Sequence, residues 1–360
     1  MRKVYLHYPD MRNGRIFESD IRDNCNDPYI ALKRRLETLG YDLRTLDDHS
    51  VEDAEWVLFF NADSVNSTIS QRLIQRFSGY SHSFRSRNVY RECVEAGLAK
   101  RIAIFLWEAP AVTPANWNLR LHKLFPILFT WHEGYIDGDR YHDIKIPQPR
   151  RYPSITPRPF RDKKLLVNIS ANKYRRHPRE LYSERRKSIR HFENARPDDF
   201  DLYGVGWNKP SGVHQRLLHY TPSTYVSYRG SVTHKWDIYP HYRFALCYEN
   251  VKDEPGYITE KIFDCMRADC VPIYWGSPNI TNIVPPEAFV DRRQFNSNEN
   301  LEHYLTNVSE TEYEQYRSAI ATFLNSDRFD SFLEDAFVDR VVSVLGLDAR
   351  DKGSTISFGG

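Results

Sequence analysis

Residues 244–278 read FALCYENVKDEPGYITEKIFDCMRADCVPIYWGSP. The apolar run 244–248 predicts a buried strand, and a loop rich in Asp, Glu, Pro and Gly follows it. Thr259 is expected to cap a helix over residues 259–268, because a threonine there precedes apolar residues at helical spacing. The run 270–275 predicts a second strand. A strand, a helix and a strand in this order predict a parallel βαβ unit.

The same alternation of strand and helix extends through most of the chain. Asp27 is expected as the N-cap of a helix that Gly40 ends. The pattern predicts α/β architecture with parallel sheets covered on both faces, whose ligands bind beyond the carboxyl ends of the strands. The other predicted strands are residues 4–8, 41–46, 56–60, 101–108, 124–131, 164–169 and 200–204, and the other predicted helices include 88–100 and 183–192.

Five prolines fall within residues 144–160, which therefore predict a linker between two domains. Ser309 and Glu312 have the spacing of a capping box and predict the start of a long helical tract that reaches about residue 345. The expected organisation is a first Rossmann-like domain over 1–150, a second over 151–310, C-terminal helices over 311–346 that could pack back on the first domain, and a disordered tail over 347–360.

Composition narrows the class of protein. Lys and Arg number 50 against 48 Asp and Glu, a net charge of +2, so no nucleic-acid partner is expected. The longest apolar run is six residues, 102–107, far short of the roughly 20 needed to span a bilayer, and no signal peptide is expected. Five scattered cysteines without a CxxC pair favour a reducing compartment. We expect a cytoplasmic protein, with peripheral contact to the inner membrane face left open by the basic tract 173–190.

Lys261 lies in the first turn of the predicted helix, after Glu260. Exposed amide groups and the helix dipole favour an anion at that end, so a lysine there does not stabilise the helix. It would serve a purpose if a phosphate or diphosphate binds beside it. The alternative is that the lysine extends into solvent.

The string YEN…GYITEKIFD…VPIYWGSP resembles the signature of the α-1,3/1,4-fucosyltransferases, glycosyltransferase family ten, in their bacterial-type soluble form. Tyr248 and Ile258 replace the Phe and Val that are usual in that signature. The resemblance continues through residues 228–250 and the segment DLYGVGW at 201–207, and it covers about residues 100–300. It implies a GT-B architecture, in which two Rossmann-like doubly wound domains face a cleft. It also implies inverting transfer of L-fucose from GDP-fucose to a glycan hydroxyl, typically O3 or O4 of N-acetylglucosamine.

The resemblance implies roles for residues of the second domain. Lys261 would neutralise the diphosphate, and Arg185, placed ahead of its neighbour Arg186, would be the second phosphate ligand. Glu260 would stabilise positive charge at the anomeric carbon of the donor. The further donor-binding positions are Glu249, Asn250, Tyr257 and Thr259. An Asx-turn for Asn250 and a packing role for the Tyr257 ring are the structural alternatives.

The resemblance also implies a general base at the end of a first-domain strand, followed by a proline. Glu108 fits, since it follows the apolar run 102–107 and precedes Ala109-Pro110. Desolvation beside Trp107 would raise the pKa of such a carboxylate toward neutrality. Glu133 is the second candidate, and an ordinary strand-ending glutamate is the alternative for Glu108.

Two Asp-x-Asp pairs, at 137–139 and 199–201, have a spacing that some glycosyltransferases use for a metal-bound diphosphate. Both are interpreted as structural, because Lys and Arg already supply positive charge. No cofactor is expected to be required, and stimulation by a divalent metal is left open. The expected partners are a nucleotide sugar and an oligosaccharide or lipid-linked glycan acceptor. Two other functions stay open: transfer of another GDP-deoxysugar, and non-catalytic binding of an anionic ligand.

Overall fold

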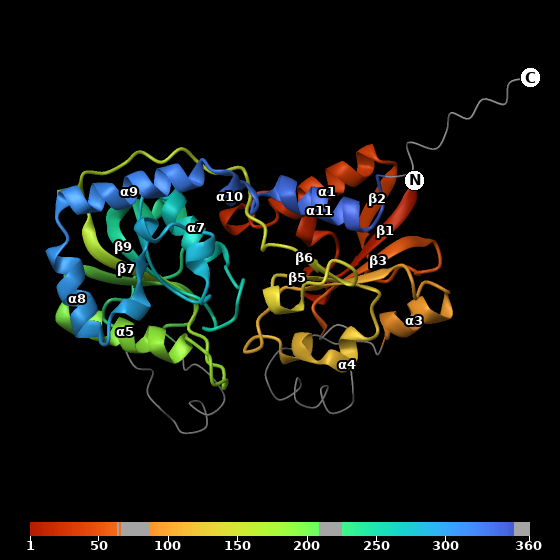
Figure 1. Ribbon diagram of the computed structural model, residues 1–360, viewed down its shortest axis with the longest axis horizontal. Coiled ribbons are helices and arrows are strands. Elements are labelled where there is room, and N and C mark those ends of the chain that lie inside the picture. Colours follow the sequence, from red (N-terminus) through yellow and green to blue (C-terminus); the bar gives the residue numbers. More distant parts are fainter. Residues whose placement is uncertain (63–64, 66–86, 209–224, 349–360) are drawn as a thin grey trace, which may run out of the picture. The chain divides into compact units, whose positions relative to one another are not determined.

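The computed structural model describes residues 1–62, 65, 87–208 and 225–348 (Figure 1). The chain divides into two compact units. The first unit comprises residues 1–108, 113–151 and the C-terminal part from Ser331. The second comprises residues 109–112 and 152–330.

The first unit is built on a six-stranded parallel sheet with the strand order β2-β1-β3-β4-β5-β6. Its alternate residues face opposite sides: Val4 and Leu6 belong to one hydrophobic core, whereas Tyr5 belongs to the other. Both faces are therefore buried, as the continuous apolar runs predict. The strands are β1 Arg2–His7, β2 Tyr41–Thr45, β3 Ala54–Phe60, β4 Ile102–Leu106, β5 Ile127–Thr130 and β6 Tyr141–Asp143.

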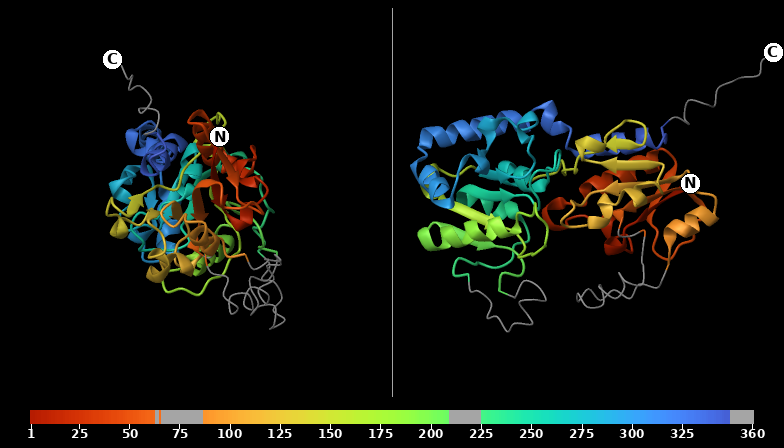
Figure 2. Two further views of the ribbon diagram at one scale, coloured as in Figure 1. Left: turned by 90° about the vertical axis from the view of Figure 1, so that its right-hand side faces the viewer. Right: turned by 60° about the horizontal axis from the view of Figure 1, so that its bottom comes forward.

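Helices cover both faces of this sheet (Figures 1 and 2). The helices α1 Asp27–Thr38 and α11 Glu334–Val344 pack on one face, where Leu36 and Val341 are fully buried. The helices α3 Val89–Glu95 and α4 Leu119–His122 contribute to the core of the other face. Asn26, and not the expected Asp27, occupies the N-cap position of α1, and its side-chain amide donates to the carbonyl of Arg15 at 2.9 Å.

The second unit contains a five-stranded parallel sheet with the order β11-β10-β9-β7-β8. Helices α7 and α9 lie on one side of it, and α5 lies on the other (Figure 1). The strands are β7 Lys164–Ile169, β8 Phe200–Tyr203, β9 Tyr242–Tyr248, β10 Val271–Trp275 and β11 Val290–Asp291. The helices are α5 Tyr182–Ala195, α7 Glu260–Arg267, α8 Asn298–Asn307, α9 Glu310–Leu324 and α10 Asp327–Asp330.

The C-terminal helices do not form the single group expected over 311–346. The helix α9 begins at the predicted capping box of Ser309 and Glu312, but it and α10 belong to the second unit, and only α11 belongs to the first. The expected disordered tail also begins too early, since Leu347 is buried in the first core. Residues 349–360 lie outside the described part of the chain.

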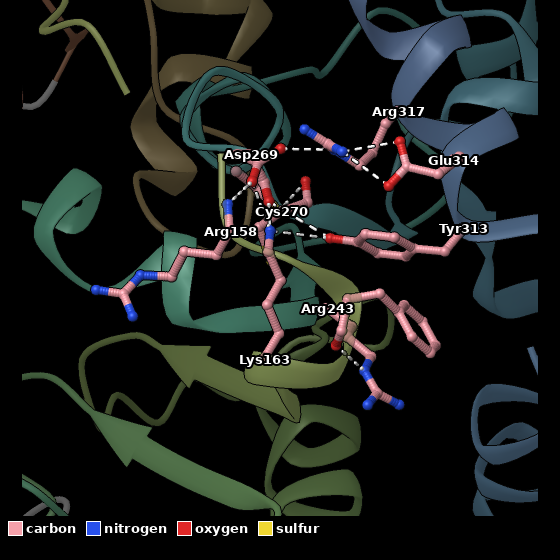
Figure 3. A network of polar contacts seen from close by, with 10 residues as sticks. Arg158, Lys163, Arg243, Asp269, Cys270, Tyr313, Glu314 and Arg317 are labelled. Atoms are coloured by element: carbon pink, nitrogen blue, oxygen red, sulfur yellow. Dashed lines mark hydrogen bonds and ion pairs between the residues drawn. The ribbon is translucent and has the colours of Figure 1, made fainter. Parts of the chain in front are cut away.

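A buried polar network holds α9 on the second unit (Figure 3). The Lys163 side chain is 0% exposed, and its ammonium donates to Asp269 Oδ2 at 2.7 Å and to the Tyr313 hydroxyl at 3.1 Å. Arg317 pairs with Asp269 Oδ1 at 2.7 Å. A buried lysine must be paired, so these bonds attach two residues of α9 to the turn before β10 and explain why the helix stays with this sheet.

None of the helices in the described ranges is both long enough and apolar enough to cross a bilayer. All five cysteines carry free thiols.

Candidate active site

The end of β9 carries the polar residues Glu249 and Asn250 to the carboxyl edge of the second sheet. The strand lies between β10 and β7, so its end is central to that edge. Ligands of open parallel sheets bind at this edge. The charged groups around Glu249 are therefore candidates for ligand binding.

Glu249 is a fully buried carboxylate, with 0% exposure. Its Oε1 accepts the backbone N–H of Thr259 at 2.8 Å, and its Oε2 accepts the Thr259 hydroxyl at 2.8 Å and Lys261 Nζ at 3.1 Å. Gly276 leaves the room for it, because a Cβ there would come within 2.5 Å of Glu249 Cγ. Glu249 thus joins the end of β9 to the start of α7.

Lys261 is held by this carboxylate and is not directed away into solvent. Its side chain is 22% exposed, and its ammonium also donates to Thr259 Oγ1 at 2.8 Å. Desolvation acts to lower the pKa of Lys261, but the negative charges of Glu249 and Glu260 outweigh it and raise that pKa above its ordinary value. The unfavourable cation at the N-terminus of α7 is therefore stabilised by an internal ion pair.

Thr259 occupies the predicted N-cap position of α7 without capping the helix through its side chain. Its hydroxyl is directed to Glu249 instead. The expectation of a side-chain cap was wrong, because the hydroxyl donates to Glu249 and its oxygen accepts the Lys261 ammonium in place of a backbone N–H.

The remaining donor-site candidates lie beside this cluster. Asn250 donates from its amide to the Tyr257 hydroxyl at 3.3 Å, which joins two of the predicted positions. Tyr257 is buried, and its carbonyl accepts the Tyr274 hydroxyl at 3.3 Å. Glu260 differs from both, since its side chain is 41% exposed and lies 3.8 Å from Lys261 Nζ.

Arg185 and Arg186 have different surroundings. Arg185, 4% exposed, donates from Nη2 to the backbone carbonyls of Tyr248 and, at 3.0 Å, Glu249. Burial lowers the pKa of Arg185, and the charge of Glu249 acts in the opposite direction. Arg186 is less buried and donates to the carbonyl of Lys173 at 2.8 Å. Arg185 therefore belongs to the charge cluster of Glu249 and Lys261.

The loop after Asn250 is held in place by Arg179, a residue for which the sequence predicted no role. Arg179 donates from Nη1 to the buried Glu254 carboxylate at 2.9 Å and to the carbonyl of Asp253 at 3.2 Å. The loop backbone also pairs with this segment, since Lys252 donates to the Arg179 carbonyl at 2.9 Å. Only the richness of the 173–190 tract in basic residues hinted at such a contact.

Glu108 lies at the carboxyl edge of the first sheet, two residues beyond the end of β4. Asn61 Oδ1 accepts the Glu108 backbone N–H at 3.1 Å, and Asn116 Nδ2 donates to the Glu108 carbonyl at 3.0 Å. Asn116 also donates to Asn61 Oδ1 at 2.7 Å. Asn61 has φ 61°, a left-handed conformation that asparagine tolerates better than most residues.

Burial, together with the charges of Tyr8, Cys25 and Glu108, raises the pKa of Tyr29 well above its ordinary value.

The second candidate base and the Asp-x-Asp pairs have simpler surroundings. Glu133 is exposed in a short 3-10 helix. Asp137 Oδ1 accepts hydrogen bonds from three backbone N–H groups of a turn. These bonds lower the pKa of Asp137, and the bond from the Tyr141 N–H has the largest effect. Asp201 pairs with Lys164 and Arg229. Within residues 1–62, 65, 87–208 and 225–348, no group of three His, Cys, Asp or Glu side chains is arranged to hold a metal ion.

Comparisons with known proteins bear on the second unit. Residues 172–323 match the model described as "Glycosyltransferase family 10 (fucosyltransferase) C-term". The chain is 36% identical over 75 residues to "Alpha-(1,3)-fucosyltransferase FucT" of Helicobacter pylori, and 35% identical over 80 residues to "Alpha-(1,4)-fucosyltransferase" of Arabidopsis thaliana. These matches cover 21% and 22% of this chain, but only 16% and 20% of the relatives.

A solved structure agrees over a larger part of the chain. "Crystal Structure of alpha1,3-Fucosyltransferase" superposes with a TM-score of 0.52 at 14% identity, covering 96% of this chain and 90% of that one. At this identity the likeness shows the fold, which is the GT-B class with two Rossmann-like α/β units. Residues 172–323 are therefore similar to the C-terminal domain of glycosyltransferase family 10 (fucosyltransferase), and the chain as a whole has the fold of the solved α1,3-fucosyltransferase.

Proposed function

We propose that the chain is an inverting glycosyltransferase that moves L-fucose from GDP-fucose to a hydroxyl of a glycan. The observation that carries the proposal is the ion pair of Lys261 and Glu249 at the N-terminus of α7, within the family 10 domain. It presents a positive charge at a helix end that already favours anions. Such a site suits the diphosphate of a nucleotide sugar.

Departure of GDP leaves negative charge on the diphosphate oxygen, and a preformed cation stabilises that charge as it develops. In the proposal Lys261 supplies the cation, and Glu249 keeps it in place. Arg185 adds positive charge to the same cluster. Glu260, the more exposed carboxylate, would face the donor sugar and stabilise positive charge at its anomeric carbon.

Inversion requires a base to remove the proton of the acceptor hydroxyl. We assign this role to Glu108. The acceptor oxygen forms a bond to the anomeric carbon, the bond from that carbon to the diphosphate breaks, GDP leaves with the electron pair, and the proton passes to Glu108. The Asn61 and Asn116 hydrogen bonds support this assignment, since they fix the backbone on both sides of the carboxylate. O3 or O4 of N-acetylglucosamine is the proposed acceptor position.

Thermal unfolding of the purified protein with GDP, UDP, ADP and CMP, each with and without a chelator, tests the donor site. We expect selective stabilisation by GDP that survives the chelator, amounting to about 2.7 kcal/mol when GDP is present at about 100 times its Kd. Stabilisation by UDP, or by all four nucleotides alike, would contradict the proposal. The alanine variants of Arg185 and Arg186, compared in the same assay, decide between the two arginines.

Transfer is then measured with GDP-fucose, GDP-mannose and a GDP-deoxysugar other than fucose as donors. Transfer of fucose alone supports the proposal in full. Transfer of a different GDP-deoxysugar would keep the reaction class and replace the sugar. Selective GDP binding without transfer to any of a panel of glycans would leave a non-catalytic ligand-binding protein.

A further inference from the structure

Three aromatic side chains near Glu108 lie outside both hydrophobic cores of the first unit. They are Trp117, His132 and Tyr135, here called the aromatic cluster. Their ring centroids are 5.3 Å apart for Trp117 and His132, 6.0 Å for Trp117 and Tyr135, and 4.8 Å for His132 and Tyr135. Such separations are typical of aromatic rings in direct contact.

The aromatic cluster is rigidly supported. The ring of Trp131, which is fully buried, lies 5.1 Å from that of Trp117 and 5.7 Å from that of His132. The Trp131 indole N–H donates to the carbonyl of Trp107 at 2.8 Å. On the other side, the Tyr141 ring stacks on Tyr135 at 5.7 Å. The cluster is therefore held in one arrangement before any ligand binds.

All three rings of the cluster are partly exposed. One side of the cluster packs on buried Trp131, and the part of each residue that stays exposed at the carboxyl edge of the sheet is available to a ligand. Aromatic rings combine a large apolar surface with polar groups at their edges, as in the Tyr135 hydroxyl. That combination suits a ligand with an apolar face surrounded by hydroxyls.

The cluster is tied directly to the proposed base. The Trp117 indole N–H donates to the Glu108 carbonyl at 3.2 Å, and the preceding residue, Asn116, donates to the same carbonyl at 3.0 Å. The ring of Trp117 is thus fixed to the backbone of Glu108. A molecule that rests on the cluster lies beside the residue that accepts the proton.

We propose that Trp117, His132 and Tyr135 form the subsite for the acceptor sugar, a hexopyranose whose C–H face packs on the rings. This inference rests on the proposed function, because it needs Glu108 as the base of a glycosyl transfer. A hexopyranose is neutral, has one face of C–H groups and is rimmed by hydroxyls, which matches the exposed part of the cluster. Tyr135 and Trp117 then influence which acceptor sugars are accepted.

The test compares Tyr135→Ala with Tyr135→Phe, which keeps the ring, and with Trp117→Phe, which keeps a ring but removes the indole N–H. Tyr316→Ala is the control, since Tyr316 is a partly exposed tyrosine on α9 whose hydroxyl bonds Tyr304 at 2.6 Å. The probes are methyl N-acetyl-β-glucosaminide and N-acetyllactosamine. Two readouts are used: the acceptor KM and kcat of fucose transfer, and saturation-transfer NMR of the probes with no donor present.

We expect Tyr135→Ala to raise the acceptor KM about 2- to 13-fold, the range for loss of one aromatic contact, and to remove the NMR signal from the C–H face of the probe. Tyr135→Phe should keep the NMR signal of the C–H face, because the ring remains, and should raise the acceptor KM less than Tyr135→Ala does. Tyr316→Ala should retain both the KM and the signal, and stabilisation by GDP should stay the same in all four variants. An unchanged acceptor KM and NMR signal in Tyr135→Ala and Trp117→Phe would overturn the inference.

Failure of the proposed function has a different signature. If the wild-type protein is not stabilised by GDP and transfers no sugar, the proposed function fails, and the NMR readout still decides the subsite. A probe signal that Tyr135→Ala abolishes then supports a sugar subsite. Absence of signal from both probes overturns it.

Discussion

The carboxyl edges of the two sheets are built from different chemistry. In the second unit the edge carries charge, with buried Glu249 joined to Lys261 and Arg185 lying beneath the same strand end. In the first unit Asn61 and Asn116 hold the backbone of Glu108, and the aromatic ring of Trp117 lies beside it. Both edges belong to parallel sheets, so the difference comes from the side chains and not from the architecture.

In the proposed function, this contrast adapts one fold to two kinds of ligand. A charged edge stabilises an anion. Because some of its charged side chains are buried away from water, each of these must have a partner of opposite charge. An amide and aromatic edge can orient a neutral, hydroxyl-bearing ligand through hydrogen bonds and ring contacts. Each variant below removes one element of this contrast.

Glu108→Gln is expected to have the largest effect. Loss of the general base should reduce the turnover of transfer by about 10²- to 10⁴-fold, while stabilisation by GDP stays unchanged because the second unit is intact. Steady-state transfer and thermal unfolding with GDP measure the two quantities. Glu133→Gln is the matched control and should keep its activity; if Glu133→Gln instead loses activity and Glu108→Gln keeps it, the roles are reversed.

Lys261→Ala should affect both transfer and nucleotide binding, which distinguishes it from the first variant. Removing a cation that stabilises the leaving group is expected to lower turnover by about 10²- to 10³-fold. It should also weaken GDP binding, as measured by calorimetry. Lys252, a lysine of the neighbouring loop whose ammonium lies over the Trp275 ring, provides the control Lys252→Ala, with near-normal values expected. Unweakened GDP binding in Lys261→Ala would remove the lysine from the diphosphate site.

Glu249→Gln tests whether the charged edge depends on its internal ion pair. It leaves Lys261 without its buried partner, and a broken buried pair costs about 3 kcal/mol of unfolding free energy. The pKa of Lys261 is raised in the folded protein, so the pair contributes fully below the ordinary lysine value of 10.5 and less as the pH rises through the higher folded value. The difference between wild type and variant in urea unfolding should therefore be constant up to about pH 10 and shrink above it. A difference that grows with pH would contradict the pairing.

Asn116→Ala removes the link between the two asparagines of the first edge. Asn116 is fully buried, and its Oδ1 accepts the backbone N–H of Ala62 at 2.7 Å. Leaving that donor unsatisfied should cost about 1 to 3 kcal/mol in urea unfolding, with no change in the effect of GDP. The surface variant Asn300→Ala should stay within about 0.5 kcal/mol of wild type. Equal stabilities for the two variants would show that the asparagine network does not support the edge.

Tyr248→Phe is the mildest change, and it restores the residue that is usual in the fucosyltransferase signature. The Tyr248 hydroxyl lies 3.1 Å from Ser188 Oγ, which also donates to Asn298 at 2.8 Å. Because Ser188 keeps one partner, the loss should be about 0.5 to 1.5 kcal/mol of unfolding free energy, and GDP binding should be unchanged. A larger loss, or weaker GDP binding, would mean that the hydroxyl acts on the charged edge.

Most of the secondary structure could be predicted from the sequence, because strands of a doubly covered parallel sheet are continuous apolar runs. The run predicted at 164–169 coincides with β7, whereas the run predicted at 101–108 is longer than β4. The strands β6 and β11 were missed, since they have three and two residues and no apolar run. The assignment of α9 to the second unit also could not be predicted, because it depends on a buried lysine whose partners are about 100 to 150 residues distant.

The candidate site was predictable in its residues but not in its pairing. The signature brought together Glu249, Asn250, Tyr257, Thr259 and Lys261, and the structure places hydrogen bonds among them. The charge of Lys261 is paired by Glu249, and this carboxylate fits only because Gly276 has no side chain. The spacing of residues in the sequence does not reveal that close approach. The roles of Asn61 and Arg179 were not predicted either, because their hydrogen-bond partners are distant in sequence. The roles of the individual residues in transfer stay predictions.

The return of α11 to the first unit has a consequence for how the protein is made. Phe337 and Val341 complete the core that begins with β1, so the unit whose strands leave the ribosome first is the last to be finished. The second unit is complete once residue 330 has been synthesised. The nascent first sheet meanwhile exposes the apolar surface that α11 will cover, a surface prone to aggregation. We therefore expect the first unit to finish folding after the second, and chaperones to be needed mainly by the beginning of the chain.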